Sequence, residues 1–271
     1  MWRSSCLISV LLALSCSTQA QAAWLQSRGE TLIISSLSSY GSDARYDDFG
    51  ARGPDRGYRK RELSFYGVYG LTDSLTIGAQ PGFYELRAHN ANTTGRQRMR
   101  GLSHVDLFVR TSILTGDYWI VSGQALVKLP GTKAVDREPL LENASRDAEA
   151  RLLFGRSGWL ARETLSLDYF LSIEAGYRYR DRRAADQWRA DATFGIRPGQ
   201  NYQIILQSFN MIAAQQGGES DPTDYDLYKA QLSVVRSLPH GMALQLGGFS
   251  EYAGRNTGAG QALFMAVWTR F

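Results

Sequence analysis

The chain has 271 residues, of which 44% are hydrophobic and 21% charged, and its formal net charge at pH 7 is +4. This charge is too small for a nucleic-acid-binding protein, which presents a strongly basic face. After the first 22 residues, no segment approaches the run of about 20 apolar residues that a membrane-spanning helix requires. The composition therefore excludes a nucleic-acid partner and a helical membrane protein.

The first part of the chain has the layout of a secretory signal peptide. Arg3 supplies the positive charge, and residues 7–14 form an apolar stretch that is too short to span a membrane as a helix. Residues 20–22, Ala-Gln-Ala, form a small-x-small cleavage site. We therefore expect residues 1–22 to be removed, which leaves residues 23–271 as a single domain.

Both cysteines, Cys6 and Cys16, lie in the predicted signal peptide. The mature chain is therefore expected to contain no thiol, disulfide or cysteine metal site, although it would fold in an oxidising compartment. An alternative interpretation is that Cys16 is the lipidated residue of a lipoprotein, but residues 13–15, Ala-Leu-Ser, fit a lipid-attachment box poorly.

From Glu30 onward the chain consists of segments in which apolar and polar residues alternate. A tilted strand needs about 9–11 such residues to cross a bilayer, and only every second one has to be apolar. The predicted strands are 30–40, 59–71, 75–87, 102–114, 118–129, 147–156, 168–180, 186–197, 201–212, 225–237, 242–252 and 260–271.

The connections between these strands alternate in length. The short ones are rich in Gly, Pro and Asp, which suits tight turns, and they are 72–74, 115–117, 198–200 and 239–241. The longer ones are polar, and they are 41–58, 88–101, 130–146 and 213–224. Two connections depart from the pattern, because 157–167 is too long for a turn and 253–259 is short for a loop.

Short turns at one rim and long loops at the other are typical of an outer-membrane barrel. The strands of a soluble β-sandwich also alternate apolar and polar residues, but that fold does not explain the alternation of short and long connections. The sequence therefore predicts an all-β, transmembrane antiparallel β-barrel of about 12 strands. Because that number is even, both termini are expected in the periplasm.

The chain ends inside its last alternating segment, on Phe271. Leu263, Met265, Val267 and Thr269 share a face with this aromatic residue. Such an end resembles that of bacterial outer-membrane barrels, whose last strand closes the cylinder and carries the assembly signal. The resemblance implies a Gram-negative outer membrane, contact with its lipid and lipopolysaccharide, and recognition of Phe271 by the barrel-assembly machinery.

The charges on the strands predict which face meets lipid, because an unpaired charge facing lipid costs about 2–4 kcal/mol at the midplane. In 168–180, for example, the acidic and basic residues share one face and the apolar residues share the other. The lumen-lining candidates are Arg110, Lys128, Arg151, Glu174, Arg178, Arg180, Arg189, Asp191, Arg197, Tyr66, Tyr118 and Phe170, and Lys229, Phe209 and Phe249 are expected to face inward as well.

Two interpretations of this lumen stay open. Opposite charges could pair across a narrow barrel that its own side chains fill. Alternatively, the basic residues and the aromatic rings could line a path for a polar or anionic solute. The basic cluster on 168–180 and 186–197 favours a path.

Enzymatic chemistry is not expected from this sequence. His104 is predicted to point inward beside Asp106, whereas Ser103 is predicted to face the opposite side, where it cannot complete a Ser-His-acid site. No phosphate-binding loop, dinucleotide fingerprint, cofactor site or metal site is predicted. Pro81 and Gly82 interrupt a predicted strand, and they predict either a bulge or a lateral opening in the wall.

Five short sequence segments resemble those of a known family. They are residues 66–73, 127–131, 174–180 and 225–229 and, as the most specific one, the glycine-rich 253–260. Together they resemble the XagA-like outer-membrane proteins, which are related to a group of transporters named after the meta-pathway of phenol degradation. The resemblance covers nearly all of the mature chain, and it provides no set of functional residues.

This resemblance implies an outer-membrane barrel with a role in exopolysaccharide production and biofilm formation. The wider group implies uptake of small hydrophobic compounds. We therefore expect a passive pore that serves surface polysaccharide export. The alternatives are an uptake channel for hydrophobic or aromatic compounds, through the lumen or through a lateral opening, and a non-conducting structural or anchoring barrel.

Overall fold

The computed structural model describes residues 23–89, 96–131, 146–162, 165–181, 185–214 and 224–271. The predicted signal peptide and large parts of the predicted loops 88–101, 130–146 and 213–224 lie outside these residues. Within the described ranges, no helix is long and apolar enough to cross a membrane.

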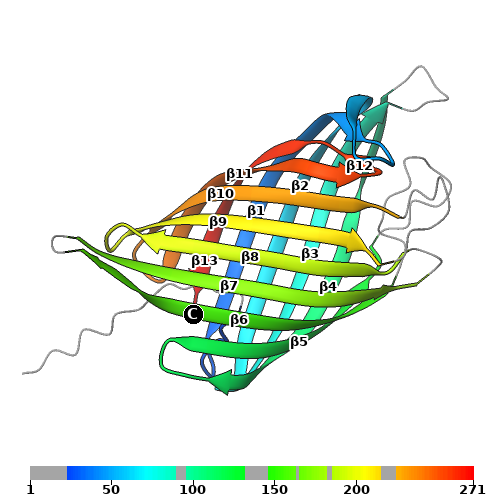
Figure 1. The fold of residues 1–271 in the computed structure, drawn as a ribbon. Helices are drawn as coiled ribbons and strands as arrows, with labels where there is room; N and C mark the ends of the chain where they lie inside the picture. Colours follow the sequence, from blue (N-terminus) through cyan, green and yellow to red (C-terminus); the bar gives the residue numbers. More distant parts are fainter. Residues whose placement is uncertain (1–22, 90–95, 132–145, 163–164, 182–184, 215–223) are drawn as a thin grey trace, which may run out of the picture.

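Twelve long strands form one closed antiparallel barrel (Figure 1). β13 pairs with both β1 and β11, and β1 pairs with β2, so the sheet has no free edge. This confirms the predicted fold class. The long strands are β1 (Thr31–Tyr46), β2 (Arg52–Thr72), β3 (Leu75–His89), β4 (Arg96–Thr115), β5 (Trp119–Leu129), β6 (Asp147–Arg162), β7 (Leu165–Arg180), β8 (Gln187–Arg197), β9 (Tyr202–Ala213), β10 (Asp226–Ser237), β11 (Met242–Arg255) and β13 (Gln261–Arg270). The short β12 (Thr257–Gly258) pairs with the end of β1.

The two rims of the barrel differ. β2 and β3, β4 and β5, and the following pairs of strands are connected at one end, which we call the turn rim. β1 begins and the chain ends at this rim, where Thr31 and Phe271 exchange backbone hydrogen bonds of 3.1 and 3.0 Å. The opposite end, which includes the predicted long loops, is called the loop rim.

Several strands are longer than the sequence predicts. β1 and β2 extend into the predicted loop 41–58 and leave only residues 47–51 between them. The predicted connection 157–167 was wrong, because Ser157 to Arg162 pair with Phe170 to Leu165 in a continuous β6–β7 ladder. Beyond the hydrocarbon layer, lipid does not enforce apolar alternation, so polar residues can continue a strand without a sequence signal.

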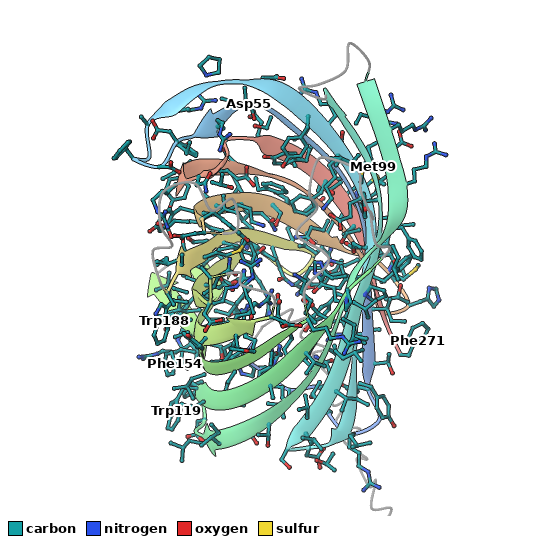
Figure 2. All side chains as sticks on the ribbon, turned by 90° about the vertical axis from the view of Figure 1, so that its right-hand side faces the viewer. Asp55, Met99, Trp119, Phe154, Trp188 and Phe271 are labelled. Atoms are coloured by element: carbon teal, nitrogen blue, oxygen red, sulfur yellow. The ribbon has the colours of Figure 1, made fainter. Side chains whose placement is uncertain are left out.

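The outer face of the barrel is apolar. In β5, Trp119, Val127 and Leu129 are exposed, whereas Ser122 and Lys128 on the alternate face are buried. Figure 2 shows the labelled Trp119, Phe154 and Trp188 pointing away from the wall. A contiguous exposed apolar face of this kind is stable against lipid and not against water.

An apolar layer fills the lumen next to the turn rim. Trp268 lies three residues from the end of the chain, and its Nε1 donates a hydrogen bond of 2.9 Å to Oε1 of Gln245. The buried members of this layer are Leu32, Val68, Phe108, Leu126, Phe170, Ile205, Val235, Ala243, Ala266 and Trp268. Side chains therefore occupy most of the barrel cross-section at this level.

The segment that precedes β1 lies inside the barrel, which the sequence did not predict. Ala23 is fully buried and packs with Ile120 and Leu153. Ser122 Oγ donates a hydrogen bond of 2.7 Å to the Ala23 carbonyl, and the Gln26 N–H donates one of 3.0 Å to Thr76 Oγ1. Residues 23–26 therefore lie along the inner wall near the turn rim.

A β-bulge lies in β4 opposite Gly82, where Ser103 and His104 face a single residue of β3. The β3–β4 register shifts between Pro81 and Phe83, and the strands pair on both sides of the shift. The structure therefore shows a bulge at this position. The bulge also turns Ser103 inward, so the prediction that Ser103 faces away from the lumen was wrong.

Candidate functional site

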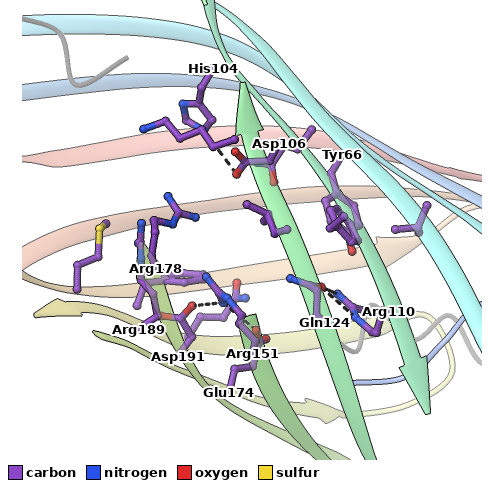
Figure 3. Close-up of a pocket in the computed structure, with 18 of the residues that line it drawn as sticks. Tyr66, His104, Asp106, Arg110, Gln124, Arg151, Glu174, Arg178, Arg189 and Asp191 are labelled. Carbon is purple, nitrogen blue, oxygen red and sulfur yellow. Dashed lines mark hydrogen bonds and ion pairs between the residues drawn. The ribbon is translucent and has the colours of Figure 1, made fainter. Parts of the chain in front are cut away.

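A cavity of about 630 Å³ lies inside the barrel (Figure 3). Charged residues of β2, β4 to β8 and β10 line much of it. At one end it follows β1 and β2, past Leu32 and Val68, to Gln26 of the N-terminal segment. The cavity therefore passes beside the apolar layer instead of stopping above it.

Eight of the twelve lumen-lining candidates line this cavity, and they are Tyr66, Arg110, Lys128, Arg151, Glu174, Arg178, Arg189 and Asp191. Phe170 faces inward but belongs to the apolar layer. Arg180 is buried outside the cavity lining, where its guanidinium lies 5.9 Å from the ring centre of Tyr225. Arg197, the last residue of β8, is partly buried at the turn rim.

Tyr118 does not line the cavity. It precedes β5 at the turn rim, where it is exposed and packs edge-on against Trp159 at 5.6 Å between ring centres. An aromatic residue at this position suits the interfacial girdle of a membrane barrel.

The cavity lining is rich in cations. Its lysines and arginines are Lys60, Arg110, Lys128, Arg151, Arg178, Arg189 and Lys229, and its carboxylates are Asp106, Glu174 and Asp191. Lys60 was not among the candidates, although Glu62 on the same face of 59–71 could have identified it. The Lys60 Nζ lies 2.8 Å from Glu62 Oε2.

Buried carboxylates hold three of these cations. Arg151 Nη1 lies 2.9 Å from Glu174 Oε2 and 2.7 Å from Asp191 Oδ2. Glu149, whose side chain is fully buried, pairs with both Arg151 and Arg178. In the same wall, Lys128 Nζ lies 3.1 Å from Asp147 Oδ2. This part of the lumen is a structural ion network, because low-dielectric surroundings strengthen each pair and penalise the loss of either partner.

Two arginines of the cavity are less fully neutralised. Arg110 donates hydrogen bonds of 2.7 and 3.1 Å to the neutral Gln124 side chain. The closest ion-pair contact of Arg189 is a long one, 3.9 Å from Nε to Glu149 Oε2. Among the described residues, the buried Nε of Arg189 has no hydrogen-bond partner.

Lys229 lies between two aromatic rings. Its Nζ is 4.6 Å from the ring centre of Phe209 and 4.8 Å from that of Phe249. In the described part of the chain, no carboxylate lies within ion-pair distance of this ammonium. The two rings attract the cation but do not cancel its charge.

The carboxylates that act on Lys229 electrostatically, Glu251 and Asp191, have other partners. Glu251 Oε2 accepts hydrogen bonds from the Tyr40 hydroxyl at 2.5 Å and from the Gly260 N–H at 3.0 Å. Asp191 pairs with Arg151. Lys229 is therefore left as a positive charge on the cavity wall that an anion in the lumen could approach.

Ser103, His104 and Asp106 lie together on the cavity wall, but they do not form a hydrolytic site. The Ser103 hydroxyl donates a hydrogen bond of 3.1 Å to the backbone carbonyl of His104. His104 Nε2 lies 3.7 Å from Asp106 Oδ2, too far for a hydrogen bond. Among the described residues, no group of three or more His, Cys, Asp or Glu side chains could hold a metal ion.

No protein-family model matches the sequence, and comparison with characterised proteins finds no match. Among solved structures, the chain is similar to an outer membrane channel from Pseudomonas putida F1, with a TM-score of 0.71, 13% identity, and coverage of 93% of this chain and 99% of that one. It is also similar to the KdgM porin in complex with disordered oligogalacturonate, with a TM-score of 0.51, 5% identity, and coverage of 89% and 99%. At these identities the likeness shows the fold. The chain is an outer-membrane β-barrel, in agreement with its apolar outer face.

Proposed function

We propose that the barrel is a passive channel and that its lumen favours anionic solutes. The observation that carries this proposal is the excess of cations around the cavity, where no carboxylate of the described residues lies within ion-pair distance of Lys229. A low-dielectric wall focuses the field of such charges into the lumen and raises the local concentration of anions.

A surface polysaccharide is the solute that the XagA-like resemblance suggests, with a role in exopolysaccharide export and biofilm formation. Residues 253–260 carry the most specific part of that resemblance. Tyr66, Phe209 and Lys229 on the cavity wall suit a sugar chain, which offers apolar ring faces and hydroxyl groups. The similar KdgM porin was solved with oligogalacturonate, which supports a sugar as a candidate solute.

Planar-bilayer recording tests the channel directly. The purified, folded barrel is expected to conduct, and anionic oligosaccharides are expected to interrupt the current more often than neutral ones of equal length. A folded barrel that shows no conductance, with or without oligosaccharides, would contradict the channel. A barrel that conducts but does not distinguish the two sugars would leave the anion preference unsupported and remove it from the proposal.

Uptake of small hydrophobic or aromatic compounds is the second candidate. It is favoured by the apolar residues Leu32, Ile34, Val68, Phe108 and Leu126, which line the part of the cavity near the turn rim. Accumulation of a radiolabelled aromatic compound in proteoliposomes separates the two candidates. Uptake that is faster than in empty liposomes and insensitive to Lys229→Met would favour this one.

A further inference from the structure

Arginines form an ordered patch on the outside of the barrel, where β2, β3 and β4 run beyond β5 towards the loop rim. β5 ends at Leu129 opposite Val105, so residues 96–104 of β4 pair with β3 alone. Met99 marks this end of β4 in Figure 2.

The strand register arranges the outward side chains here in three rows across β2, β3 and β4. The first row is apolar and consists of Leu63, Phe83 and Leu102, with Leu63 and Phe83 exposed. The second row is Arg61, Glu85 and Arg100, and the third is Arg59, Arg87 and Arg98. On all three strands the apolar outer face therefore ends at the same level, and arginines begin directly beyond it.

Glu85 draws three of these arginines together. Its carboxylate lies 2.7 Å from Arg87, 2.6 Å from Arg98 and 2.7 Å from Arg100. The three arginine side chains keep 48–64% of their surface exposed, so each guanidinium can still meet a ligand from outside.

The patch keeps a positive charge after its internal pairs are counted. Arg59 pairs with Asp43 at 3.0 Å, and Arg61 lies on the second row beside Glu85. Five arginines against Glu85 and Asp43 leave a net charge of +3. Guanidinium groups in such an array bind phosphate oxygens in pairs.

The depth of the patch matches a lipid headgroup. Successive rows lie about 7 Å apart along a strand, and the headgroup layer beyond the hydrocarbon core is roughly 5–8 Å thick on each side. A lipid whose chains cover Leu63 and Phe83 would therefore present its phosphates to the second and third rows.

We propose that this patch is a binding site for the phosphorylated headgroup of lipopolysaccharide in the outer leaflet. Lipid A fits because it carries phosphates at headgroup depth above several acyl chains, so one molecule can use both the apolar row and the arginine rows. The site sets the loop rim at the outer leaflet. It does not depend on whether the lumen conducts.

Binding of purified lipid A to the detergent-folded barrel, followed by native mass spectrometry, tests the site. The Arg61→Gln/Arg100→Gln variant removes two arginines and leaves Glu85 paired with Arg87 and Arg98. The matched control is Arg156→Gln/Arg236→Gln, which changes two exposed arginines elsewhere on the wall. Heat-modifiable migration in gels verifies that each variant is folded.

The first variant is expected to bind bisphosphorylated lipid A about thirtyfold more weakly than the wild type, because each of the two arginines near an anionic lipid surface contributes about 1 kcal/mol. The control variant should bind like the wild type, and removal of both phosphates from lipid A should weaken wild-type binding to a similar extent. Equal binding by the Arg61→Gln/Arg100→Gln variant, or equal binding of phosphatidylglycerol and lipid A by the wild type, would overturn the proposal.

Discussion

The buried carboxylate of Glu149 is the residue on which the lumen's ion network depends most. It pairs with Arg151 and Arg178, and its side chain is fully buried. We expect Glu149→Gln to lower the free energy of unfolding by roughly 3–5 kcal/mol, because it removes a fully buried counter-charge from two buried guanidinium groups at once. Urea titration of the barrel in lipid vesicles measures this loss.

The control for that measurement is Asp43→Asn, which also removes one carboxylate from an arginine pair. The Asp43 side chain is 74% exposed, so its loss should cost less than about 1 kcal/mol. Equal losses for the two variants would show that burial does not decide the strength of these pairs.

Lys229 differs from Glu149 because its removal leaves no carboxylate unpaired. We expect Lys229→Met to preserve the stability of the barrel and to lower its preference for anions over cations by about twofold or more at low salt. Single-channel recording with ion substitution measures this preference. The control is Arg156→Gln on the outer face, which should leave the preference for anions unchanged. If Arg156→Gln lowered the preference as much as Lys229→Met does, the effect would come from the overall charge of the barrel and not from Lys229.

Residue facing was predictable from the sequence wherever lipid enforces alternation. Lys128 and Glu174 line the cavity because a charge on the opposite face would meet lipid. Ser103 was mispredicted because an extra residue in its own strand, β4, opposite Gly82 shifts the register. Tyr118 lies outside the cavity because β5 begins only at Trp119. Neither the bulge nor the start of β5 changes the alternation of apolar and polar residues from which we predicted the direction of each side chain.

At the scale of elements, the N-terminal segment narrows the turn-rim end of the cavity. Trp24 packs over Gly155 of β6, and a Cβ at that glycine would overlap the Trp24 ring. We expect Gly155→Ala to displace the segment and to raise the single-channel conductance. The reason is that Gln26, which lines the cavity, follows Trp24 in the same segment.

The matched control for this change is Gly67→Ala on β2. A Cβ there would meet nothing closer than the Ala79 carbonyl oxygen at 3.9 Å. The control should conduct like the wild type. If Gly155→Ala also conducts like the wild type while tryptophan fluorescence reports that Trp24 has moved, the segment does not restrict the path.

Strand positions were predictable and strand ends were not. All twelve predicted strands are present, because each must cross the hydrocarbon layer and keep its phase. The sequence did not predict that β1 and β2 extend into 41–58. Outside the membrane, backbone pairing can continue without an alternation of apolar and polar side chains, so the sequence pattern does not mark these parts of the strands. The internal position of residues 23–26 was missed because a short apolar run does not specify which surface it packs against.

At the scale of the whole molecule, the apolar outer face requires a lipid environment. Leu246 is 54% exposed on β11, in the middle of this face. Leu246→Arg should destabilise the barrel in vesicles by about 2–4 kcal/mol if the residue lies near the bilayer midplane. The same change at Phe49, which is 94% exposed in the connection after β1, should have little effect.

A cationic lumen should conduct anions in preference to cations. The reversal potential of the wild-type barrel across a KCl gradient tests it most directly, because the sign reports which ion carries the current. A reversal potential towards the chloride equilibrium value is the predicted result, and it should move towards zero in Lys229→Met. A reversal potential towards the potassium equilibrium value in the wild type would contradict this anion preference.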